Sequence, residues 1–539
     1  MNTQPGPSAS QKAAQTQAAQ AAQHPATQRP ATQLADVQRV QAAQHLAEDV
    51  QHTAAPPASA PAFIRTEELF GGQFGSARTH ALEQQYGNGK LNRLLEVVGA
   101  GGPFRALTPW ELQDAQGHRV INASGYAALP FGDNPPELNA FIRRVLEDPQ
   151  QMMFAQQSVS EWRAALEANL VRLLARESAS AGDDSHASSR VFFSNSGAEA
   201  VEAAIKFAQA ARPRARYIIN FARAYHGKTL GALALTPNPS LQGPFRNILS
   251  PNVITLPFGD ADAVQRTLKR VGADKIMAVI TEPILGEAGV RLPPPGFLKR
   301  LGELCQQSGV LVIADEIQTG LGRSGNWFES VAQGLIPDII TLAKPLGGGV
   351  TAVGATIVRH EIYKKLLGSV ETVKRHSTTF GGNTLAMAVG LKSLEMLMDA
   401  QAPARSRRLG ERGLARLKAV QSRYPELLEE VRGAGMLFGM NFRPVAALPF
   451  RFQANLISEA TGILALVAFY RGGALVNFSL NAARTMRLTP AMNIPEETFD
   501  ELFTRVERTA AAYPSSFKLV QRYGTPRLLG LLKAAFLED

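Results

Sequence analysis

The chain has 539 residues, of which 45% are hydrophobic, and its formal net charge is +10 at pH 7. Its single cysteine, Cys305, excludes an intrachain disulfide framework and suits a reducing compartment, so we expect a cytoplasmic protein. No apolar run reaches the roughly 18 residues that a membrane span needs, and neither zinc-ligand spacing nor a recognition motif accompanies the basic charge. The composition therefore predicts no membrane span and no nucleic-acid partner.

The chain divides by composition into five segments. Residues 1–60 are rich in Gln, Ala and Pro and poor in large apolar side chains. They cannot bury enough surface to offset their ordering entropy, so we expect a disordered tail. Residues 61–155 are predicted to contribute to a smaller domain, and residues 156–385 to form the large domain. Residues 386–514 are predicted to complete the smaller domain, and residues 515–539 to form a helical extension.

The central part of the chain alternates between short apolar runs and helical stretches, after a predicted hairpin at Trp110–Val120 and a predicted helix at Pro135–Leu146. Strands are expected at Val191–Phe193, Tyr217–Phe221, Ile276–Thr281, Val310–Ala314, Ile339–Leu342 and Ala355–Val358. This alternation predicts an α/β large domain, with a mostly parallel sheet covered by helices on both faces. Further strands near Gly433–Phe442 and Thr485–Leu488 predict that the smaller domain is of the α+β type.

A strand-to-helix turn is the first candidate ligand site. The segment VFFSNSGAEA, residues 191–200, predicts a buried strand, a turn of small residues and the start of a helix. Backbone N–H groups of Ser196, Gly197 and Ala198 would be free there, and the helix dipole would make the position suitable for a phosphate. An ordinary N-terminal cap explains the same residues equally simply.

Two further strands end in ionisable residues. Asp315 follows the apolar run at residues 311–314, where ligands bind in open α/β sheets, although a capped turn is the alternative. Lys344 follows the run at residues 339–343 and precedes a proline and three glycines. A partly desolvated lysine loses proton affinity and becomes an amine nucleophile for Schiff bases. The alternative is a strand-end lysine whose ammonium reaches water.

Tyr225 and His226 follow the strand Tyr217–Phe221 in the segment AYHGKT, residues 224–229. Tyr225 could stack on a planar ring, whereas His226 is most simply a structural hydrogen-bonding residue. Cys305 lies in a helical apolar pattern, which predicts a buried thiol rather than a nucleophile.

Taken together, these motifs resemble the class III aminotransferases, the ornithine- and 4-aminobutyrate-like enzymes of the pyridoxal 5′-phosphate (PLP) fold type I. The resemblance covers about Trp110 to Glu497 and rests on the segments SNSGAEAVEAAIK, YHGKTLGA, TEPILGEAGVRLPPPGFL, ADEIQTGLGRSG, PDIITLAKPLGGG and TTFGGN, in this order. Within the class, GEAGVRLPPPGFL and SLNAARTMRLTP look most like the putrescine (diamine) aminotransferases.

The resemblance implies PLP as the cofactor and a role for each matched residue. Lys344 would hold PLP as a Schiff base and then move the substrate's proton, and Asp315 would keep the pyridine nitrogen protonated. Tyr225 would stack on the ring, and Gln318 would lie near the ring O3′. No metal is implied. The residues implied in cofactor binding are Ser196, Gly197, Ala198, Tyr225, His226, Glu282, Asp315, Gln318, Lys344 and Thr379.

The resemblance also implies partners and substrates. Thr379 would reach the phosphate of a partner subunit, which implies a homodimer with shared active sites. Arg487 would bind a substrate α-carboxylate, and Glu287 would cover Arg487 when an amine without that carboxylate binds. The expected substrates are an amine (a diamine, an ω-amino acid or a long-chain amine or aldehyde) and a 2-oxo acid such as 2-oxoglutarate. Leu285 stands where the family has Gln, which leaves the amine open.

Two other functions share these residues. A PLP-dependent aminomutase would have the same fold and the same motifs but would need no second substrate. A non-catalytic, basic binding protein could retain the fold, although intact Lys344 and Asp315 argue against that function.

Overall fold

The computed structural model of this chain describes residues 64–70, 75–92, 102–153, 158–445 and 451–523. The chain separates after Gly75 into two compact units, and the first contains helix α3 (Thr66–Phe70). The predicted tail, residues 1–60, lies outside the described residues. The predicted C-terminal extension is helical over residues 516–523, and its remainder, residues 524–539, lies outside the described residues as well.

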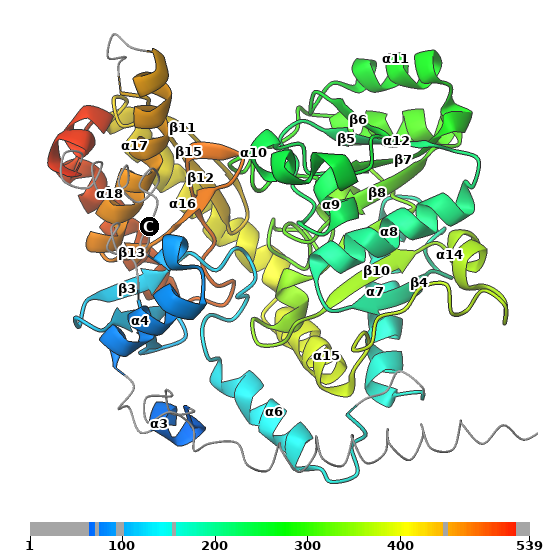
Figure 1. Cartoon of the computed structure of the whole chain (residues 1–539), viewed down its shortest axis with the longest axis horizontal. Coiled ribbons are helices and arrows are strands. Elements are labelled where there is room, and N and C mark those ends of the chain that lie inside the picture. Colours follow the sequence, from blue (N-terminus) through cyan, green and yellow to red (C-terminus); the bar gives the residue numbers. More distant parts are fainter. Residues whose placement is uncertain (1–63, 71–74, 93–101, 154–157, 446–450, 524–539) are drawn as a thin grey trace, which may run out of the picture. The chain divides into compact units, whose positions relative to one another are not determined.

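A seven-stranded sheet, here called the large sheet, forms the centre of the second unit (Figure 1). Its strand order is β4-β10-β9-β8-β7-β5-β6, and β10 runs opposite to the other strands, which are parallel to one another. This arrangement confirms the predicted α/β class with a mostly parallel sheet. The strands are β4 (Arg190–Ser194), β5 (Tyr217–Phe221), β6 (Val253–Leu256), β7 (Ile276–Thr281), β8 (Leu311–Asp315), β9 (Ile339–Leu342) and β10 (Gly354–Val358).

Helices cover both faces of the large sheet. Neighbouring residues of β9, Ile339 and Ile340, are both fully buried but belong to different hydrophobic cores, because successive side chains of a strand point to opposite faces. Burial on both faces explains why these strands are continuous apolar runs rather than alternating ones. One face packs against α8 (Gly197–Ala211) and α14 (His360–Leu367). The other face packs against α7 (Glu161–Ser180), α11 (Ala261–Val271), α12 (Phe297–Ser308) and α15 (Thr384–Asp399).

Two four-stranded sheets complete the second unit. The first, in the order β1-β2-β3-β13, contains the predicted hairpin as β2 and β3, and it adds β13 parallel to β3. The second, here called the C-terminal sheet, has the order β11-β12-β15-β14. The strands are β1 (Phe104–Ala106), β2 (Glu111–Asp114), β3 (Arg119–Asn122), β11 (Leu428–Ala434), β12 (Leu437–Phe442), β13 (Ala474–Leu475), β14 (Asn477–Ser479) and β15 (Ala482–Leu488).

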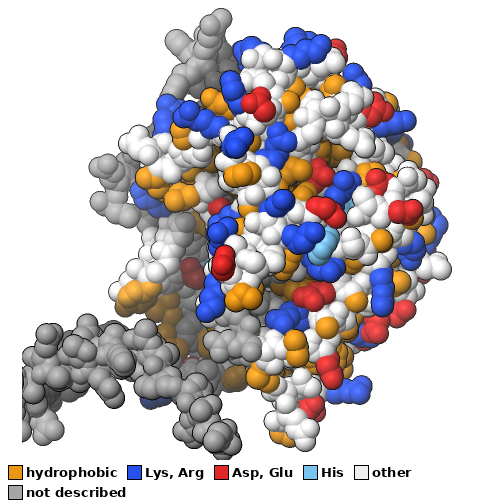
Figure 2. All heavy atoms as spheres, turned by 90° about the vertical axis from the view of Figure 1, so that its right-hand side faces the viewer, with side chains coloured by type: hydrophobic (Ala, Val, Ile, Leu, Met, Phe, Trp, Pro, Cys, Tyr) orange, Lys and Arg blue, Asp and Glu red, His pale blue; other side chains and the backbone are white. Residues whose placement is uncertain are grey.

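The remaining helices surround these sheets. The long helices that accompany the C-terminal sheet are α16 (Ala402–Arg423), α17 (Arg451–Arg471) and α18 (Glu496–Ala512). The other helices are α4 (Ser76–Tyr86), α6 (Pro136–Glu147), α9 (Leu230–Ala234), α10 (Pro239–Gln242) and α13 (Glu329–Ala332). Within the described part of the chain, no helix combines the length and the apolar character of a membrane span. On the face shown in Figure 2, Lys and Arg side chains are interspersed with Asp and Glu, so the basic charge does not merge there into one stripe.

Candidate active site

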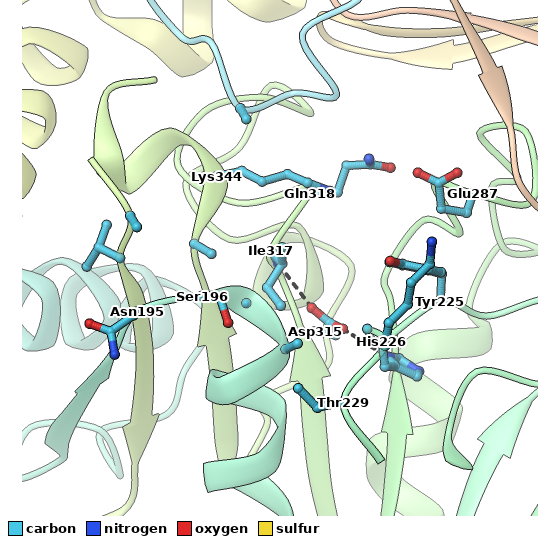
Figure 3. A pocket seen from close by; sticks show the side chains of 18 of the residues that line it. Asn195, Ser196, Tyr225, His226, Thr229, Glu287, Asp315, Ile317, Gln318 and Lys344 are labelled. Carbon is cyan, nitrogen blue, oxygen red and sulfur yellow. Dashed lines mark hydrogen bonds and ion pairs between the residues drawn. The ribbon is translucent and has the colours of Figure 1, made fainter. Parts of the chain in front are cut away.

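A cavity of about 760 Å³ lies where five strands of the large sheet end (Figure 3). Because β4, β5, β7, β8 and β9 run in one direction, their carboxyl ends meet at one edge, where open α/β sheets bind ligands. The residues that follow these strands and line the cavity are Asn195–Ala198, Tyr225–Thr229, Glu282, Glu287, Asp315, Ile317, Gln318 and Lys344. The structure therefore brings every predicted cofactor residue except Thr379 to one cavity.

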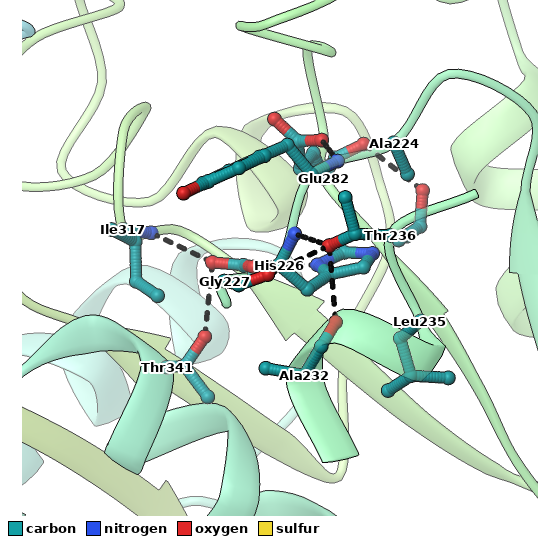
Figure 4. Close-up of polar contacts among 12 residues, drawn as sticks. Ala224, His226, Gly227, Ala232, Leu235, Thr236, Glu282, Ile317 and Thr341 are labelled. Atoms are coloured by element: carbon teal, nitrogen blue, oxygen red, sulfur yellow. Dashed lines mark hydrogen bonds and ion pairs between the residues drawn. The ribbon is translucent and has the colours of Figure 1, made fainter. Parts of the chain in front are cut away.

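Asp315 forms the floor of the cavity at the end of β8. Its carboxylate is 3% exposed, and its Oδ2 lies 2.6 Å from His226 Nδ1. Oδ1 accepts hydrogen bonds from Thr341 Oγ1 at 3.1 Å and from Ile317 N at 3.2 Å. The His226 backbone is held in turn, since its N–H donates to Thr236 Oγ1 at 2.9 Å (Figure 4). A buried carboxylate with these partners has a fixed position and orientation.

Lys344 lies after the neighbouring strand, β9, and begins a short 3-10 turn that continues through Gly347. Burial lowers the pKa of the Lys344 ammonium below its usual value, although the negative charge of Glu287 opposes this change. A lysine with a lowered pKa has a larger neutral fraction, and the neutral amine is the nucleophilic form. Figure 3 shows Lys344 beside Gln318, on the same cavity as Asp315.

The N-terminus of α8 forms another wall of the cavity. Ser196 is the N-cap of this helix, and its Oγ accepts a hydrogen bond from Glu199 N at 3.2 Å. The capping interpretation of Ser196 is therefore correct, and it coexists with a position on the cavity wall. A Cβ atom at Gly197 would lie 2.8 Å from Ile317 Cδ1, so a side chain here would require Ile317 to shift. The resulting helix start offers backbone N–H groups and the positive end of the helix dipole to an anion.

Tyr225 and Glu282 form the wall opposite α8. The buried Glu282 accepts hydrogen bonds from Tyr225 N and Gly286 N, each at 2.9 Å. Burial raises the pKa of Glu282 to about 7, so this side chain titrates near neutral pH. Burial also raises the pKa of the Tyr225 phenol, which therefore stays neutral. Glu282 thus connects the segment of Tyr225 with the loop that continues to Glu287.

Glu287 and Arg487 form an ion pair at the rim of the cavity, although one comes from the loop after β7 and the other from β15. Glu287 Oε1 lies 2.7 Å from Arg487 Nη2, and both side chains are buried. With its amide oxygen facing the two cations, Gln318 accepts hydrogen bonds from Lys344 Nζ and Arg487 Nη1, each at 3.1 Å. Gln318 therefore links the lysine to the guanidinium of the rim.

Two predicted residues do not line the cavity. Arg487 is fully buried behind it and is connected to it through Glu287 and Gln318, which do line it. Thr379 is exposed in a turn and does not line the cavity formed by the described residues of this chain. Its expected contact involves a second copy of the chain, so that expectation stays a prediction.

Sequence reasoning missed three contacts of the site. Thr341 holds Asp315 from the adjacent strand, and its signal was the polar residue in the otherwise apolar run IITL. Tyr126, at a positive φ of 50°, places its ring 5.7 Å from the Arg487 guanidinium carbon. Leu480 donates its N–H to Glu287 Oε2 at 3.1 Å, and no local sequence pattern indicates that bond.

Several solved structures have this fold. The chain has 25% sequence identity, with a TM-score of 0.70, to the ornithine aminotransferase of Toxoplasma gondii ME49, a likeness that covers 84% of this chain and 99% of that one. It has 26% identity and a TM-score of 0.65 to the acetylornithine aminotransferase of Elizabethkingia anophelis, covering 81% and 99%. An amine transaminase from an uncultivated Pseudomonas species, in its PLP-bound form, shares the fold at 24% identity and a TM-score of 0.66, covering 76% and 94%.

The family assignment rests on a match that spans most of the chain. The model of the class-III aminotransferase family matches residues 109–510, which include all the cavity residues described above. The match also agrees with the mostly parallel sheet and with the position of the cavity at its carboxyl edge. This chain therefore belongs to the class-III aminotransferases, PLP-dependent enzymes of fold type I.

Proposed function

We propose that this enzyme transfers an amino group from an amine without an α-carboxylate to a 2-oxo acid such as 2-oxoglutarate, with Lys344 as the cofactor-bearing residue. The observation that carries the proposal is that Lys344 and the buried Asp315, from neighbouring strands, line one cavity with the Glu287–Arg487 pair at its rim. Neither an aminomutase nor a non-catalytic binding protein gains support from the relatives, which are named as aminotransferases and transaminases.

The donor set of the cavity suits PLP. Asp315 presents a buried carboxylate for a protonated pyridine nitrogen, and Lys344 presents an amine of lowered pKa for an aldehyde. The start of α8 suits a phosphate, because residues 196–198 line the cavity at the N-terminus of the helix, where backbone N–H groups and the positive end of the helix dipole are available. When bound, PLP supplies an electron-withdrawing ring that takes up negative charge from the reacting carbon.

The residues of the chain then have separate tasks. Asp315, held by His226 and Thr341, keeps a proton on the ring nitrogen through a charge-assisted hydrogen bond. Lys344 acts as the nucleophile and then as the base and acid that moves a proton at the reacting carbon. Tyr225 covers one side of the ring site, and Ser196 with its neighbours at the start of α8 holds the phosphate.

Substrate recognition is assigned to the rim. The buried Glu287–Arg487 pair neutralises Arg487 when an amine lacking an α-carboxylate binds, so the guanidinium is not left buried without a partner. A 2-oxo acid needs the same guanidinium for its carboxylate, and Glu287 must then turn away. The structural relative named as an amine transaminase supports an amine as the donor. Within this group, a diamine such as putrescine is the donor that we propose to test first.

A homodimer completes the proposal. The cavity is bordered by residues 349–353, where Val350 is 45% exposed, and Asn195 of the cavity wall donates a hydrogen bond to Thr378 Oγ1 of the motif TTFGGN at 2.8 Å. Exposed apolar side chains next to a site favour coverage by another protein surface. We infer that a second copy covers this edge and that its Thr379 contributes to the site. Sedimentation of the holoenzyme should give twice the chain mass, whereas a monomer with full activity would contradict the shared site.

The function is tested by half-reactions. The enzyme is loaded with PLP and mixed with single amines in the absence of any 2-oxo acid, while the absorbance of the bound cofactor is followed. We expect bleaching of the near-ultraviolet band with diamines or ω-amino acids, and recovery of that band when 2-oxoglutarate is added. If no amine bleaches the band, the proposed transfer is wrong. Repeated conversion of the amine into an isomeric amine, with no keto product released and no need for a second substrate, would indicate an aminomutase.

A further inference from the structure

The turn between β14 and β15, residues 480 and 481, reaches from the C-terminal sheet to loops at the edge of the large sheet. In Figure 1 this hairpin lies next to α10. Asn481 Nδ2 donates to Arg223 O at 2.9 Å and to Ala224 O at 3.1 Å. Asn481 Oδ1 accepts from Asn238 Nδ2, at the start of α10, at 2.6 Å. Both polar atoms of the Asn481 side chain thus bind loop residues that follow β5 of the large sheet.

The backbone of the same turn holds Glu287. Asn481 N donates to the carbonyl oxygen of Glu287 at 2.9 Å, and Leu480 N donates to its Oε2 at 3.1 Å. The other carboxylate oxygen, Oε1, pairs with Arg487. Each oxygen of Glu287 therefore has its own partner, and the turn holds the carboxylate in the orientation that covers Arg487.

The loop that carries Glu287 is fixed against the C-terminal sheet. The carbonyl oxygen of Gly289 accepts a hydrogen bond from Arg432 Nε at 2.7 Å. Gly289 has a φ of +84°, and a Cβ atom at this position would lie 2.7 Å from Thr485 Oγ1. Ile284 and Val290 of the loop are fully buried against Leu437. Because the backbone is confined in this way, Arg487 is uncovered by rotation of the Glu287 side chain, and that rotation must break the bond from Leu480.

We propose that Asn481 is a positioning residue that sets substrate preference, because it anchors the turn whose Leu480 N–H keeps Glu287 over Arg487. The inference rests on the proposed function, since it takes Arg487 as the site of a substrate carboxylate. Without the side-chain bonds of Asn481, the turn is held to the Glu287 loop by backbone bonds alone, and the Leu480 N–H is positioned less firmly on Glu287 Oε2. Arg487 then becomes more available to carboxylates, and amines without a carboxylate meet a less completely neutralised guanidinium.

The test compares Asn481→Ala and Asn481→Asp with the wild-type holoenzyme. Asn481→Asp keeps the acceptor for Asn238 and removes the donor to residues 223 and 224, so it tests the anchor with a smaller change of shape. Asn441→Ala is the matched control, because Asn441 bonds to Glu429 and Thr485 within the C-terminal sheet. Glutarate binding is measured by calorimetry, and half-reactions are measured with 1,4-diaminobutane and with glutamate.

The two substrate classes should respond in opposite directions. In both Asn481 variants we expect glutarate to bind about three- to tenfold more tightly and the KM for the diamine to rise about three- to tenfold, the effect of one or two hydrogen bonds. The kcat with the diamine should change less than its KM. In Asn441→Ala, the affinity for glutarate and the KM for the diamine should stay unchanged. Weaker binding of both classes, or equal changes in the Asn441 control, would overturn the role of Asn481. A wild-type enzyme that reacts with no amine would instead overturn the proposed function, because the glutarate measurement does not depend on turnover.

Discussion

Asp315 and Lys344 lie at the ends of adjacent strands of one sheet, whereas Glu287 lies in the loop after β7, Arg487 lies in β15 of the C-terminal sheet, and the two meet only at the rim of the cavity. Hydrogen bonds from neighbouring strands and turns fix the carboxylate of the floor. The rim depends on the orientation of one glutamate side chain, held by an ion pair and by the Leu480 N–H. The floor therefore suits a function that does not change during the reaction, and the rim suits one that must alternate between two substrates.

The catalytic role of the floor can be tested first at Lys344. Lys344→Ala should fold and retain PLP without a covalent bond, but turnover should fall by several orders of magnitude, because the nucleophile and the proton carrier are lost together. Lys344→Arg is the matched control, since it keeps the positive charge and lacks a nucleophilic amine. Borohydride treatment followed by mass spectrometry should attach the cofactor to the wild type and to neither variant. Near-normal turnover in Lys344→Ala would refute the assignment of the floor.

The role of the rim can be tested with two substitutions that should change the substrate preference in opposite directions. Arg487→Ala should weaken the half-reaction with 2-oxoglutarate or glutamate by about 2–5 kcal/mol, the cost of removing one partner of a desolvated charge pair. Amines without an α-carboxylate should be affected much less. Glu287→Ala should impair these amines more than amino acids, because Arg487 is then buried without its partner.

Stopped-flow measurement of both half-reactions in each variant separates the two preferences. Arg484→Ala is the control, since Arg484 lies on the same strand as Arg487 and pairs with Glu429 instead. Equal losses for both substrate classes in Arg487→Ala would mean that the arginine is structural and that the rim does not alternate between substrates.

Smaller effects on the rate are expected from substituting Asp315, which would bond to the ring nitrogen, and its partner Thr341. Asp315→Asn should lower the half-reaction rate on the order of a hundredfold with every amine, because a charge-assisted hydrogen bond is replaced by a neutral one. Thr341→Val removes one neutral hydrogen bond to Asp315, so its rate should fall only about two- to tenfold. Both losses should be independent of the substrate class, and a change of substrate preference in either variant would contradict the separation of floor and rim.

The last prediction concerns stability, through Glu282, which bonds to the segments of both the floor and the rim. Its pKa is raised to about 7 in the folded chain, above the usual value for a glutamate. The folded state therefore favours the protonated form, so this contribution to stability is fully present below the usual pKa and is lost as the pH rises through 7. Relative to Glu282→Gln, the wild type should lose on the order of 2 kcal/mol of unfolding free energy between about pH 4.5 and 7.

Denaturant unfolding of the wild type and of Glu282→Gln across this pH range measures the difference directly. The difference should be flat well above pH 7, where Glu282 is ionised in both the folded and the unfolded chain. An increase of the wild-type stability relative to the variant as the pH rises would show that the folded state favours the charged form instead.

The local sequence pattern was sufficient to predict most of the strands and residues that form the floor of the cavity. The strands Tyr217–Phe221, Ile276–Thr281 and Ile339–Leu342 were predicted with the bounds that the structure has, because a strand buried on both faces is an uninterrupted apolar run. Asp315 and Lys344 could be placed at the sheet edge because each directly follows such a run. The strand β6 was missed, since its residues Val253–Leu256 form a short edge strand with only Leu256 buried.

Tertiary structure decided which of these residues meet. Sequence periodicity indicates how deeply each segment is buried, but the packing of one sheet against another sets the distance between side chains that are far apart in the chain. The ion pair between Glu287 and Arg487 was implied only by the family resemblance, and the 2.7 Å contact required the loop after β7 to dock on the C-terminal sheet. The same docking places Asn481 on the loop before Tyr225, a contact that no local pattern predicts. The chemistry of the floor was thus readable from residues next to each strand, whereas the rim exists only because the loop after β7 docks on the C-terminal sheet.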